Sequence, residues 1–222
     1  TPATITSHGE EFGEFTATIP KNTRRIHFIA NQNMTDFQED EFRNKSEADV
    51  IALLEGSSGM MIYWARFACD ANNEEPIDQQ LAKNPNIIMI RNQAKITIDN
   101  PTGNGYLVVT GFTAYNTNAF GTVAPYHPTK GWVWSSNADV EPFVTLPAND
   151  AKLSDIQDVQ DISLNPELYV FECENSSEDP VSVIIRGYLP GESEELYYRV
   201  MLIKENGEQE LIRRNHHYTF HI

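Results

Sequence analysis

The sequence predicts an all-β protein built as an antiparallel sandwich, and three observations support this fold class. Apolar and polar residues alternate at a period of two in most apolar segments, as Phe15, Ala17 and Ile19 do in GEFTATIP. These segments are rich in Val, Ile, Tyr, Phe and Thr, and Gly, Pro, Asn or Asp separates most of them. No long helical pattern lies between them, which favours antiparallel sheets over a parallel one.

Nine segments carry the strand pattern, so strands are expected over much of the chain. In chain order they are residues 13–20, 24–31, 86–99, 105–116, 131–136, 167–174, 181–189, 195–207 and 211–222. The polar, acidic stretch 145–167 predicts an irregular connection that could cross between sheets.

One segment has a helical pattern instead. In KSEADVIALLEGSSG, Ser46 is a typical N-cap residue, acidic residues occupy the first turn, and Gly56 follows the last apolar position. A short amphipathic helix is therefore expected over Glu47–Glu55. PIDQQLAKN, residues 76–84, predicts one or two further helical turns.

The composition argues against several classes of partner. With 32 acidic and 16 basic residues the formal net charge is −16, which disfavours nucleic acid and anionic membrane surfaces. No apolar segment approaches the roughly 20 residues of a membrane span, and the first ten residues lack a signal-peptide pattern. Cys69 and Cys173 fit neither a zinc motif nor a redox pair, so two buried thiols are expected.

The ending LIRRNHHYTFHI holds three of the six histidines and alternates strictly. As one strand it would place Tyr218, Phe220 and Ile222 on the core face, with His217 and His221 on the opposite face. Four residues of strand separate those two histidines by about 13 Å, whereas zinc–nitrogen bonds measure about 2 Å. His216 points to the other side. The ending therefore predicts a final strand and no metal site.

No motif for catalysis occurs in the chain. GxSxG, HExxH, P-loop and GxGxxG patterns are absent from the sequence, and acidic pairs lie in polar, turn-like surroundings. We therefore expect no enzyme activity and no cofactor.

Three aromatic residues have two possible roles. Trp132 and Trp134 project to one face of a strand, and Tyr126 lies just upstream. Such a group could stack on sugar rings as a binding platform. It could equally close a sandwich core or an interface between domains, which is the reading we favour.

Three motifs together point to a family. IRRNHHYTFHI contains Arg-Asn-x-x-Tyr, and it is expected to pair with the preceding strand LYYRVMLI as a closing hairpin. IIMIRNQAKITID contains Arg-x-x-Ala-Lys. RIHFIANQN ends a strand in Ala-Asn, and AYNTNAFGTVAP follows later in the chain. In order and spacing these motifs resemble the fimbrillins, which are pilins and pilus-associated lipoproteins of Bacteroidetes, and the likeness covers nearly the whole chain. The matching residues are Arg91, Ala94, Lys95, Arg214, Asn215 and Tyr218, with Ala30 and Asn31.

The resemblance implies two transthyretin-like antiparallel β-sandwich domains, here residues 1–95 and 96–222, with the 91–99 strand closing the first or opening the second. It also implies export as a lipoprotein and a place in a pilus at the outer-membrane surface, with no catalytic site. Its partners would be other pilus subunits, joined by strand addition, and host or bacterial surface ligands. The alternative function is a surface glycan-binding lipoprotein that uses Tyr126, Trp132 and Trp134.

The chain departs from the family at its start. Fimbrillins have a further strand pair before the Ala-Asn strand and a lipobox cysteine. TPATITSHGEE is too polar to replace that pair, and no such cysteine precedes Arg25. We therefore expect the chain to begin partway into its N-terminal domain, which would leave an open sheet edge there.

Overall fold

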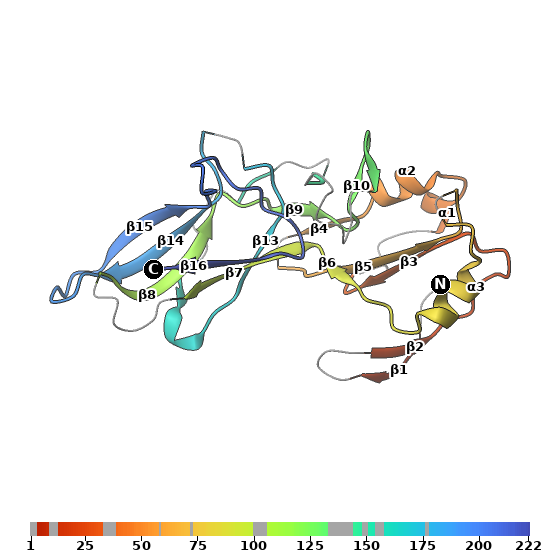
Figure 1. The fold of residues 1–222 in the computed structure, drawn as a ribbon, viewed down its shortest axis with the longest axis horizontal. Helices are drawn as coiled ribbons and strands as arrows, with labels where there is room; N and C mark the ends of the chain where they lie inside the picture. Colours follow the sequence, from red (N-terminus) through yellow and green to blue (C-terminus); the bar gives the residue numbers. More distant parts are fainter. Residues whose placement is uncertain are drawn as a thin grey trace. The chain divides into compact units, whose positions relative to one another are not determined.

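The fold is seen in a computed structural model (Figure 1). It describes residues 4–8, 13–32, 39–57, 59–71, 73–99, 106–132, 144–147, 151–153, 158–175 and 178–222. Strands predominate within these ranges, and the helices there are short. The all-β class predicted from alternation is therefore confirmed.

The contacts divide the chain into two compact units. The first comprises Thr1–Phe28 with Arg66–Ile88, and the second comprises Ile29–Ala65 with Met89–Ile222. The division by contacts does not fall at residue 95, and the predicted pair of domains, 1–95 and 96–222, stays a prediction.

The first unit contains a hairpin and a helix. β1 (Thr4–His8), which lies outside the predicted strands, pairs antiparallel with β2 (Gly13–Thr16). α3 (Ile77–Lys83) confirms the helical turns expected in PIDQQLAKN. Gln80 in α3 is buried, and its amide donates to the carbonyls of Ala68 at 2.8 Å and Glu75 at 2.6 Å. This amide fixes the helix against the chain that precedes it.

A three-stranded sheet has the order β3-β5-β6. β3 (Arg25–Ala30) is an edge strand, and β5 (Tyr63–Ala68) pairs antiparallel with β6 (Ile90–Arg91). β6 ends just before Asn92, and β7 (Gln93–Asp99) joins a different sheet. The predicted single strand over 86–99 is thus two strands that belong to different sheets.

The helix expected after Ser46 is present but shorter than predicted. α2 spans Glu47–Ala52, and Ser46 forms a reciprocal capping box with Asp49. Gly56 does not end the helix. It lies in β4 (Glu55–Ser57), opposite Gly121 in β9 (Phe120–Thr122). A Cβ on Gly56 would lie 2.8 Å from Ile62 Cδ1, so packing explains the glycine. α1 (Glu39–Phe42) precedes this segment.

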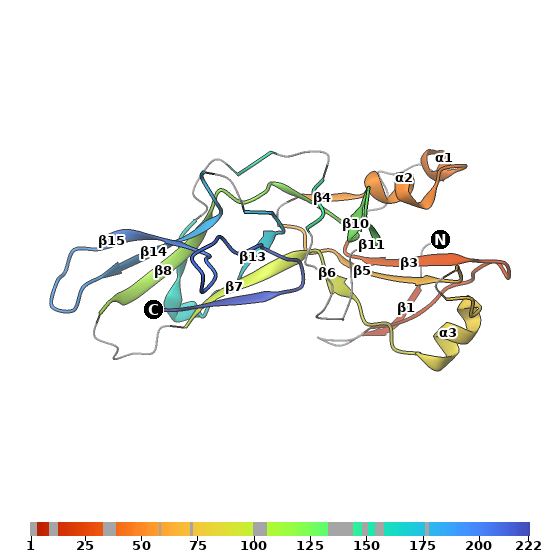
Figure 2. The same cartoon turned by 45° about the horizontal axis from the view of Figure 1, so that its top comes forward.

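The second unit contains a β-sandwich (Figures 1 and 2). One sheet has the order β12-β8-β14-β15 and is antiparallel throughout. Its strands are β12 (Gln160–Asp161), β8 (Val108–Tyr115), β14 (Ser182–Tyr188) and β15 (Leu196–Met201), and η1 (Ile162–Leu164) follows β12. The other sheet has the order β13-β7-β16, with β13 (Leu168–Phe171) and β16 (His217–His221) flanking β7.

The sandwich core contains residues of both sheets. Alternating positions of β7, β8, β13 and β14 supply its buried side chains, among them Ile96, Phe112, Val170 and Ile185. Segments predicted as strands from their alternation therefore supply this core. A smaller apolar cluster surrounds Trp64, and the hairpin of β10 (Tyr126–His127) and β11 (Gly131–Trp132) packs against it.

Two expectations about the chain's ending are wrong. β15 and the final strand do not form a closing hairpin, because β15 pairs with β14 while β16 runs parallel to β7. The ending is also not one continuous strand. β16 begins at His217, and Asn215 just before it has a positive φ of 58°. From Tyr218 onward the predicted faces are confirmed, since Tyr218 and Phe220 pack on the core.

Candidate functional site

The six residues that carry the family resemblance gather around β7 and the turn before β16. Asn215 donates its backbone N–H to the carbonyl of Gln93 at 2.9 Å, and its side-chain Oδ1 accepts the N–H of Arg91 at 3.4 Å. The Arg91 guanidinium donates to the carbonyl of His216 at 2.9 Å, and the N–H of Lys95 donates to the same carbonyl at 2.9 Å. Two motifs more than a hundred residues apart are thus directly bonded.

Ala94 and Lys95 lie on opposite faces of β7. Ala94 is fully buried in the sandwich core. Lys95 points outward and forms an ion pair with Glu167, which also accepts a hydrogen bond from the Tyr169 hydroxyl at 2.6 Å. Arg91 lies over the Tyr169 ring at 5.8 Å. These contacts join β7 to β13 on the outer face of the sheet.

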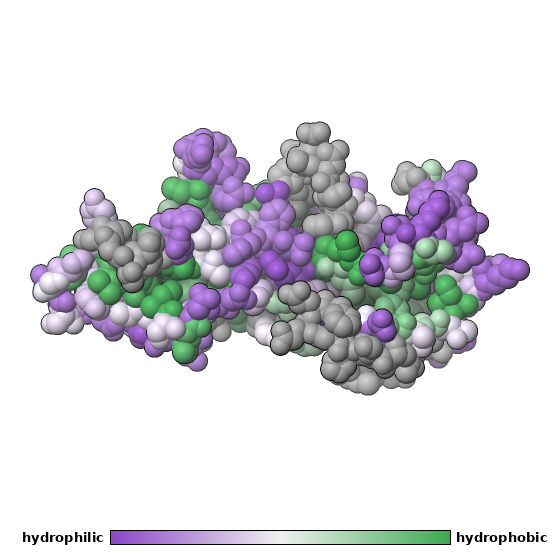
Figure 3. Space-filling view, turned by 60° about the horizontal axis from the view of Figure 1, so that its bottom comes forward, coloured by the Kyte–Doolittle hydropathy of each residue, from purple (hydrophilic) through white to green (hydrophobic). Residues whose placement is uncertain are grey.

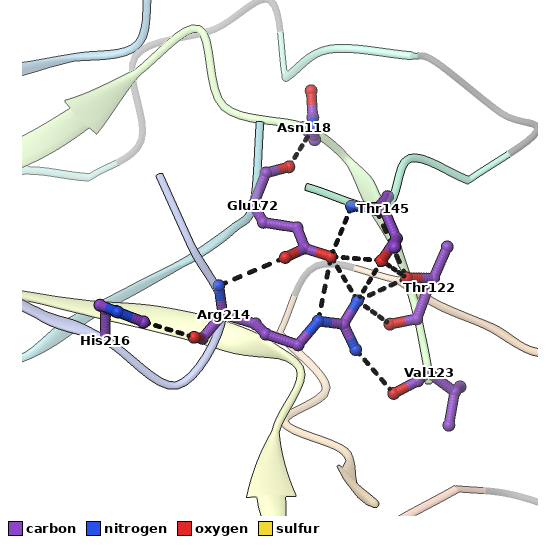
Figure 4. A network of polar contacts seen from close by, with 7 residues as sticks. All are labelled: Asn118, Thr122, Val123, Thr145, Glu172, Arg214 and His216. Carbon is purple, nitrogen blue, oxygen red and sulfur yellow. Dashed lines mark hydrogen bonds and ion pairs between the residues drawn. The ribbon is translucent and has the colours of Figure 1, made fainter. Parts of the chain in front are cut away.

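Arg214 and Glu172 form a buried ion pair at the centre of the site (Figure 4). Each side chain is only 3% exposed, and Arg214 Nη2 lies 2.5 Å from Glu172 Oε1. The guanidinium also donates to the carbonyl of Val123 at 3.0 Å and to Thr145 Oγ1 at 2.9 Å. A buried charge is tolerated only when it is paired and its remaining hydrogen-bonding groups are satisfied, which is the arrangement here.

The same carboxylate gathers further segments. Glu172 Oε1 accepts the Thr145 N–H at 3.1 Å and its hydroxyl at 2.5 Å. The Arg214 guanidinium also donates to the carbonyl of Thr122 at 3.2 Å, and Asn118 donates its amide to the Glu172 carbonyl at 2.8 Å. The pair therefore links the ends of β9 and β13, the segment around Thr145 and the turn that leads into β16.

Sequence reasoning missed Glu172 and the threonines that surround Arg214. A signal for Glu172 was present, because it continues the alternation of Leu168 and Val170, which pack on the core. A carboxylate on the apolar face of a strand requires a buried cation. The sequence could not show that this cation was Arg214, which lies 42 residues further on.

Asn215 adopts a left-handed conformation, with φ at 58°. Asn populates this region more readily than most residues, and a Cβ-bearing residue without a polar side chain is disfavoured there. Asn215→Ala should therefore lower the free energy of unfolding by about 1–2 kcal/mol, and Asn215→Gly by clearly less. Chemical denaturation of the three proteins measures this order. Equal losses for both variants would show that the side-chain contact to Arg91, and not the backbone conformation, is what matters.

Tyr169 and Glu167 perturb each other's protonation. The hydrogen bond from Lys95, followed by the one from Tyr169, lowers the pKa of Glu167. The hydrogen bond to Glu167, with some burial, raises the pKa of Tyr169 to about 12. The folded state thus favours the neutral phenol, so its contribution to stability is complete below the ordinary tyrosine pKa of about 10 and is lost as pH rises toward the folded value. Ultraviolet titration should show Tyr169 among several tyrosines that ionise late, since the pKa values of Tyr115 and Tyr218 are also raised, and Glu167→Gln should remove the delay of one of them. An unchanged titration in the variant would contradict this assignment.

The two thiols are buried, as predicted. Cys69 and Cys173 are free, with exposed fractions of 7% and 5%. Burial raises the pKa of the Cys173 thiol, and the thiolate is the reactive form. Neither cysteine should react with a thiol reagent at neutral pH until the protein unfolds. Rapid labelling of the native protein, read by mass spectrometry, would contradict this expectation.

The aromatic residues of the alternative function lie partly in a core. Trp132 stacks on buried Trp64 with ring centroids 5.4 Å apart and planes 13° apart, and Tyr126 contacts Trp132 edge-on at 5.0 Å. One face of Trp132 is therefore occupied by protein. Trp134 lies outside the described residues. A role of these residues in sugar binding stays a prediction.

The final histidines have separate polar partners. His217 Nε2 lies 2.7 Å from Thr97 Oγ1, and His221 Nδ1 lies 3.0 Å from Asp99 Oδ2. Within the described residues, no group of three or more His, Cys, Asp or Glu side chains could hold a metal ion. In the same part of the chain, no helix is long and apolar enough to cross a membrane.

Comparison with known proteins gives distant structural likenesses. Two crystal structures of candidate cell adhesion proteins resemble the chain. One is from Parabacteroides distasonis, with 16% identity over 95% of this chain and 70% of that chain and a TM-score of 0.43. The other is from Bacteroides eggerthii, with 11% identity over 93% of this chain and 70% of that chain and a TM-score of 0.49. No protein-family profile and no curated protein sequence matches the chain.

Proposed function

We propose that the chain is a structural or adhesive subunit of a cell-surface pilus, and that its subunits join by strand addition. In this proposal it is an exported lipoprotein of the fimbrillin type, placed at the outer-membrane surface, with two transthyretin-like domains. Its partners are other pilus subunits and surface ligands.

The observation that supports this proposal is the convergence of the six signature residues. They were chosen by resemblance alone and belong to two motifs. One motif lies at the start of β7 and the other near the C-terminus of the chain. In the structure Arg91 forms hydrogen bonds with Asn215 and with the carbonyl of His216, and Lys95 donates its backbone N–H to the same carbonyl. Arg214 is fully enclosed, and the Tyr218 hydroxyl bonds within the same turn. Such a cluster holds the final strand in place, which suits a subunit that must bear load along a fibre.

The physical basis of assembly would be the pairing of backbone groups across subunits. A strand at the edge of a sheet presents unpaired N–H and C=O groups, and an incoming strand satisfies them while its alternate side chains set the register. The sheets described above have such edge strands, since β3 and β15 each end a sheet.

Immunogold electron microscopy tests this function directly. Cells that express the full-length gene should carry filaments labelled by antibodies raised against the purified chain, and a deletion strain should show none. Labelling confined to the cell interior, or spread over the surface without filaments in any growth condition, would contradict the pilus proposal.

A further inference from the structure

β15 forms an open edge of the larger sheet. It pairs with β14 in an unbroken register from Ser182↔Met201 to Gly187↔Leu196. Among the described residues, no strand pairs with its other side, and Figures 1 and 2 show β15 at the outer side of β14. Beyond its end, a narrow hairpin continues with the bridge Ile203↔Gln209. Its whole length, Leu196–Met201, is therefore available to a further strand.

Apolar side chains are exposed along this edge. The exposed fractions are 45% for Leu196, 63% for Tyr197 and 46% for Met201. Tyr197 and Met201 lie on the outer face of the sheet, whereas Tyr198 and Val200 alternate with them and pack on the sandwich core. Leu196, at the start of the strand, shares the face of Tyr198. Figure 3 shows, on one face of the molecule, that apolar patches lie among polar ones on the surface. Exposed apolar residues are ordinary when scattered, but here they lie together along one open edge.

The usual protections of an edge strand are missing from β15. Native proteins blunt such edges with proline, bulges or exposed lysine. β15 contains no proline or lysine, and its register with β14 has no bulge. Its one charged residue, Arg199, is held by Asp179 at 2.6 Å and lies over the Tyr115 ring.

β16, one of the two edge strands of the other sheet, differs in this respect. Its exposed positions are His217, Thr219 and His221, and each has a polar partner on β7. Of these two edges, β15 is the one whose side chains favour an apolar partner.

The charges at both ends of β15 indicate what that partner is. Six carboxylates flank the strand and only one cation, Lys204, lies among them. Lys204 pairs with Glu208, and Glu195 pairs with Arg186. The remaining four hold no ion pair within the described part of the chain: Glu192, Glu194, Glu205 and Glu210.

A second copy of β15 would be a poor occupant. In an antiparallel pair, the acidic start of one strand would lie beside the acidic end of the other, and each chain carries a net charge of −16. Like charges placed side by side weaken the binding of a partner, whereas opposite charges strengthen it.

We propose that the open edge of β15 binds an extended strand of another protein whose alternate residues are apolar and whose two ends are basic. This rests on the proposed function, because it names the edge and the chemistry of the strand that is added. The ladder of backbone hydrogen bonds supplies affinity. Contacts with Tyr197 and Met201 set the register, and the flanking glutamates select a partner with lysine or arginine at its ends.

A synthetic peptide tests the proposal with the purified chain. The probe has alternating Thr and Val residues between pairs of lysines, and fluorescence anisotropy measures its binding. We expect binding that weakens with added salt, because the flanking charges are exposed to solvent. The same peptide with glutamates at its ends should bind about tenfold more weakly or worse. The same peptide with N-methylated central residues should not bind, since it lacks the N–H donors of a ladder.

Matched variants locate the site. Met201→Lys and Tyr197→Thr should each lower the affinity for the lysine-flanked peptide by about fivefold or more. Thermal melting should confirm that both variants fold. Leu164→Lys makes a comparable change at a side chain that is 77% exposed and lies away from β15, and it should leave binding unchanged. Hydrogen exchange should slow at alternate amides of β15 when the peptide is bound.

The outcomes separate this proposal from the pilus function. Absent binding, equal binding of the two charged peptides, or protection at β16 instead of β15 would overturn the proposal. Self-association that is lost in Met201→Lys would overturn it in favour of a second copy as the occupant. If labelled filaments form but the peptide does not slow hydrogen exchange in β15, the pilus function stands and strand addition uses another sheet edge. If the peptide binds but no filaments exist, the β15 site stands without the pilus.

Discussion

Arg214→Met should lower the free energy of unfolding by about 3–5 kcal/mol. The substitution keeps much of the side-chain volume but leaves the Glu172 carboxylate without its counter-charge at a site where each partner is only 3% exposed. It also removes the donors to the carbonyl of Val123 and the hydroxyl of Thr145. An uncompensated buried charge costs far more than the intact pair contributes, which is why removal of one partner is so severe. Denaturant unfolding followed by tryptophan fluorescence measures the loss.

Two further variants separate the ion pair from its surroundings. Lys204→Met breaks an exposed pair with Glu208 and should cost less than about 1 kcal/mol. Adding Glu172→Gln to Arg214→Met removes the unpaired charge, so the double variant should be more stable than Arg214→Met alone. If Arg214→Met costs no more than Lys204→Met, or the double variant is the least stable of all, the pair is not the centre of this cluster.

The sequence was most informative where structure is local. Alternation identified the segments of β8, β13 and β14 as strands, because the period of a strand is a property of the backbone itself. The Ser46 cap predicted α2 because a capping box is closed within three residues. The end of that helix was placed too late, since β4 pairs with β9, which lies far along the chain.

The errors arose where pairing is non-local. β15 and β16 are neighbours in the sequence, and a hairpin was expected, yet β16 runs parallel to β7. Nothing in the alternation of a strand tells which partner it has or in which direction the partner runs. Asn215, with its positive φ, breaks the predicted final strand, and a single asparagine among alternating residues does not distinguish a turn from a strand.

For the candidate site too, the sequence indicated individual residues but not their non-local contacts. Resemblance supplied Arg91, Lys95, Arg214, Asn215 and Tyr218, but not what they do. Their roles depend on the parallel register of β7 and β16, which brings the two motifs together. Alternation gave a signal for Glu172, but only the structure identifies its partner as Arg214.

Tyr218→Ala should lower the free energy of unfolding by about 3 kcal/mol, near the lower limit for aromatic residues because the side chain is only half-buried. The ring packs on the sandwich core, and its hydroxyl closes the turn before β16. That hydroxyl donates to the carbonyl of Leu211 at 2.8 Å and accepts the N–H of Arg213 at 3.0 Å. Tyrosine is protonated at neutral pH because its ordinary pKa is about 10, and burial raises the pKa of this phenol further.

Neighbouring substitutions divide this effect into its parts. Tyr218→Phe keeps the ring and should cost about 1 kcal/mol for the two lost hydrogen bonds. Phe220→Ala, on the same face of β16, should cost nearly as much as Tyr218→Ala. Thr219→Ala lies on the exposed face, opposite Thr97, and should cost well under half as much. Denaturant unfolding ranks the four variants. Equal losses at residues 218, 219 and 220 would mean that both faces of β16 are covered, as they would be in a strand buried at an interface between subunits.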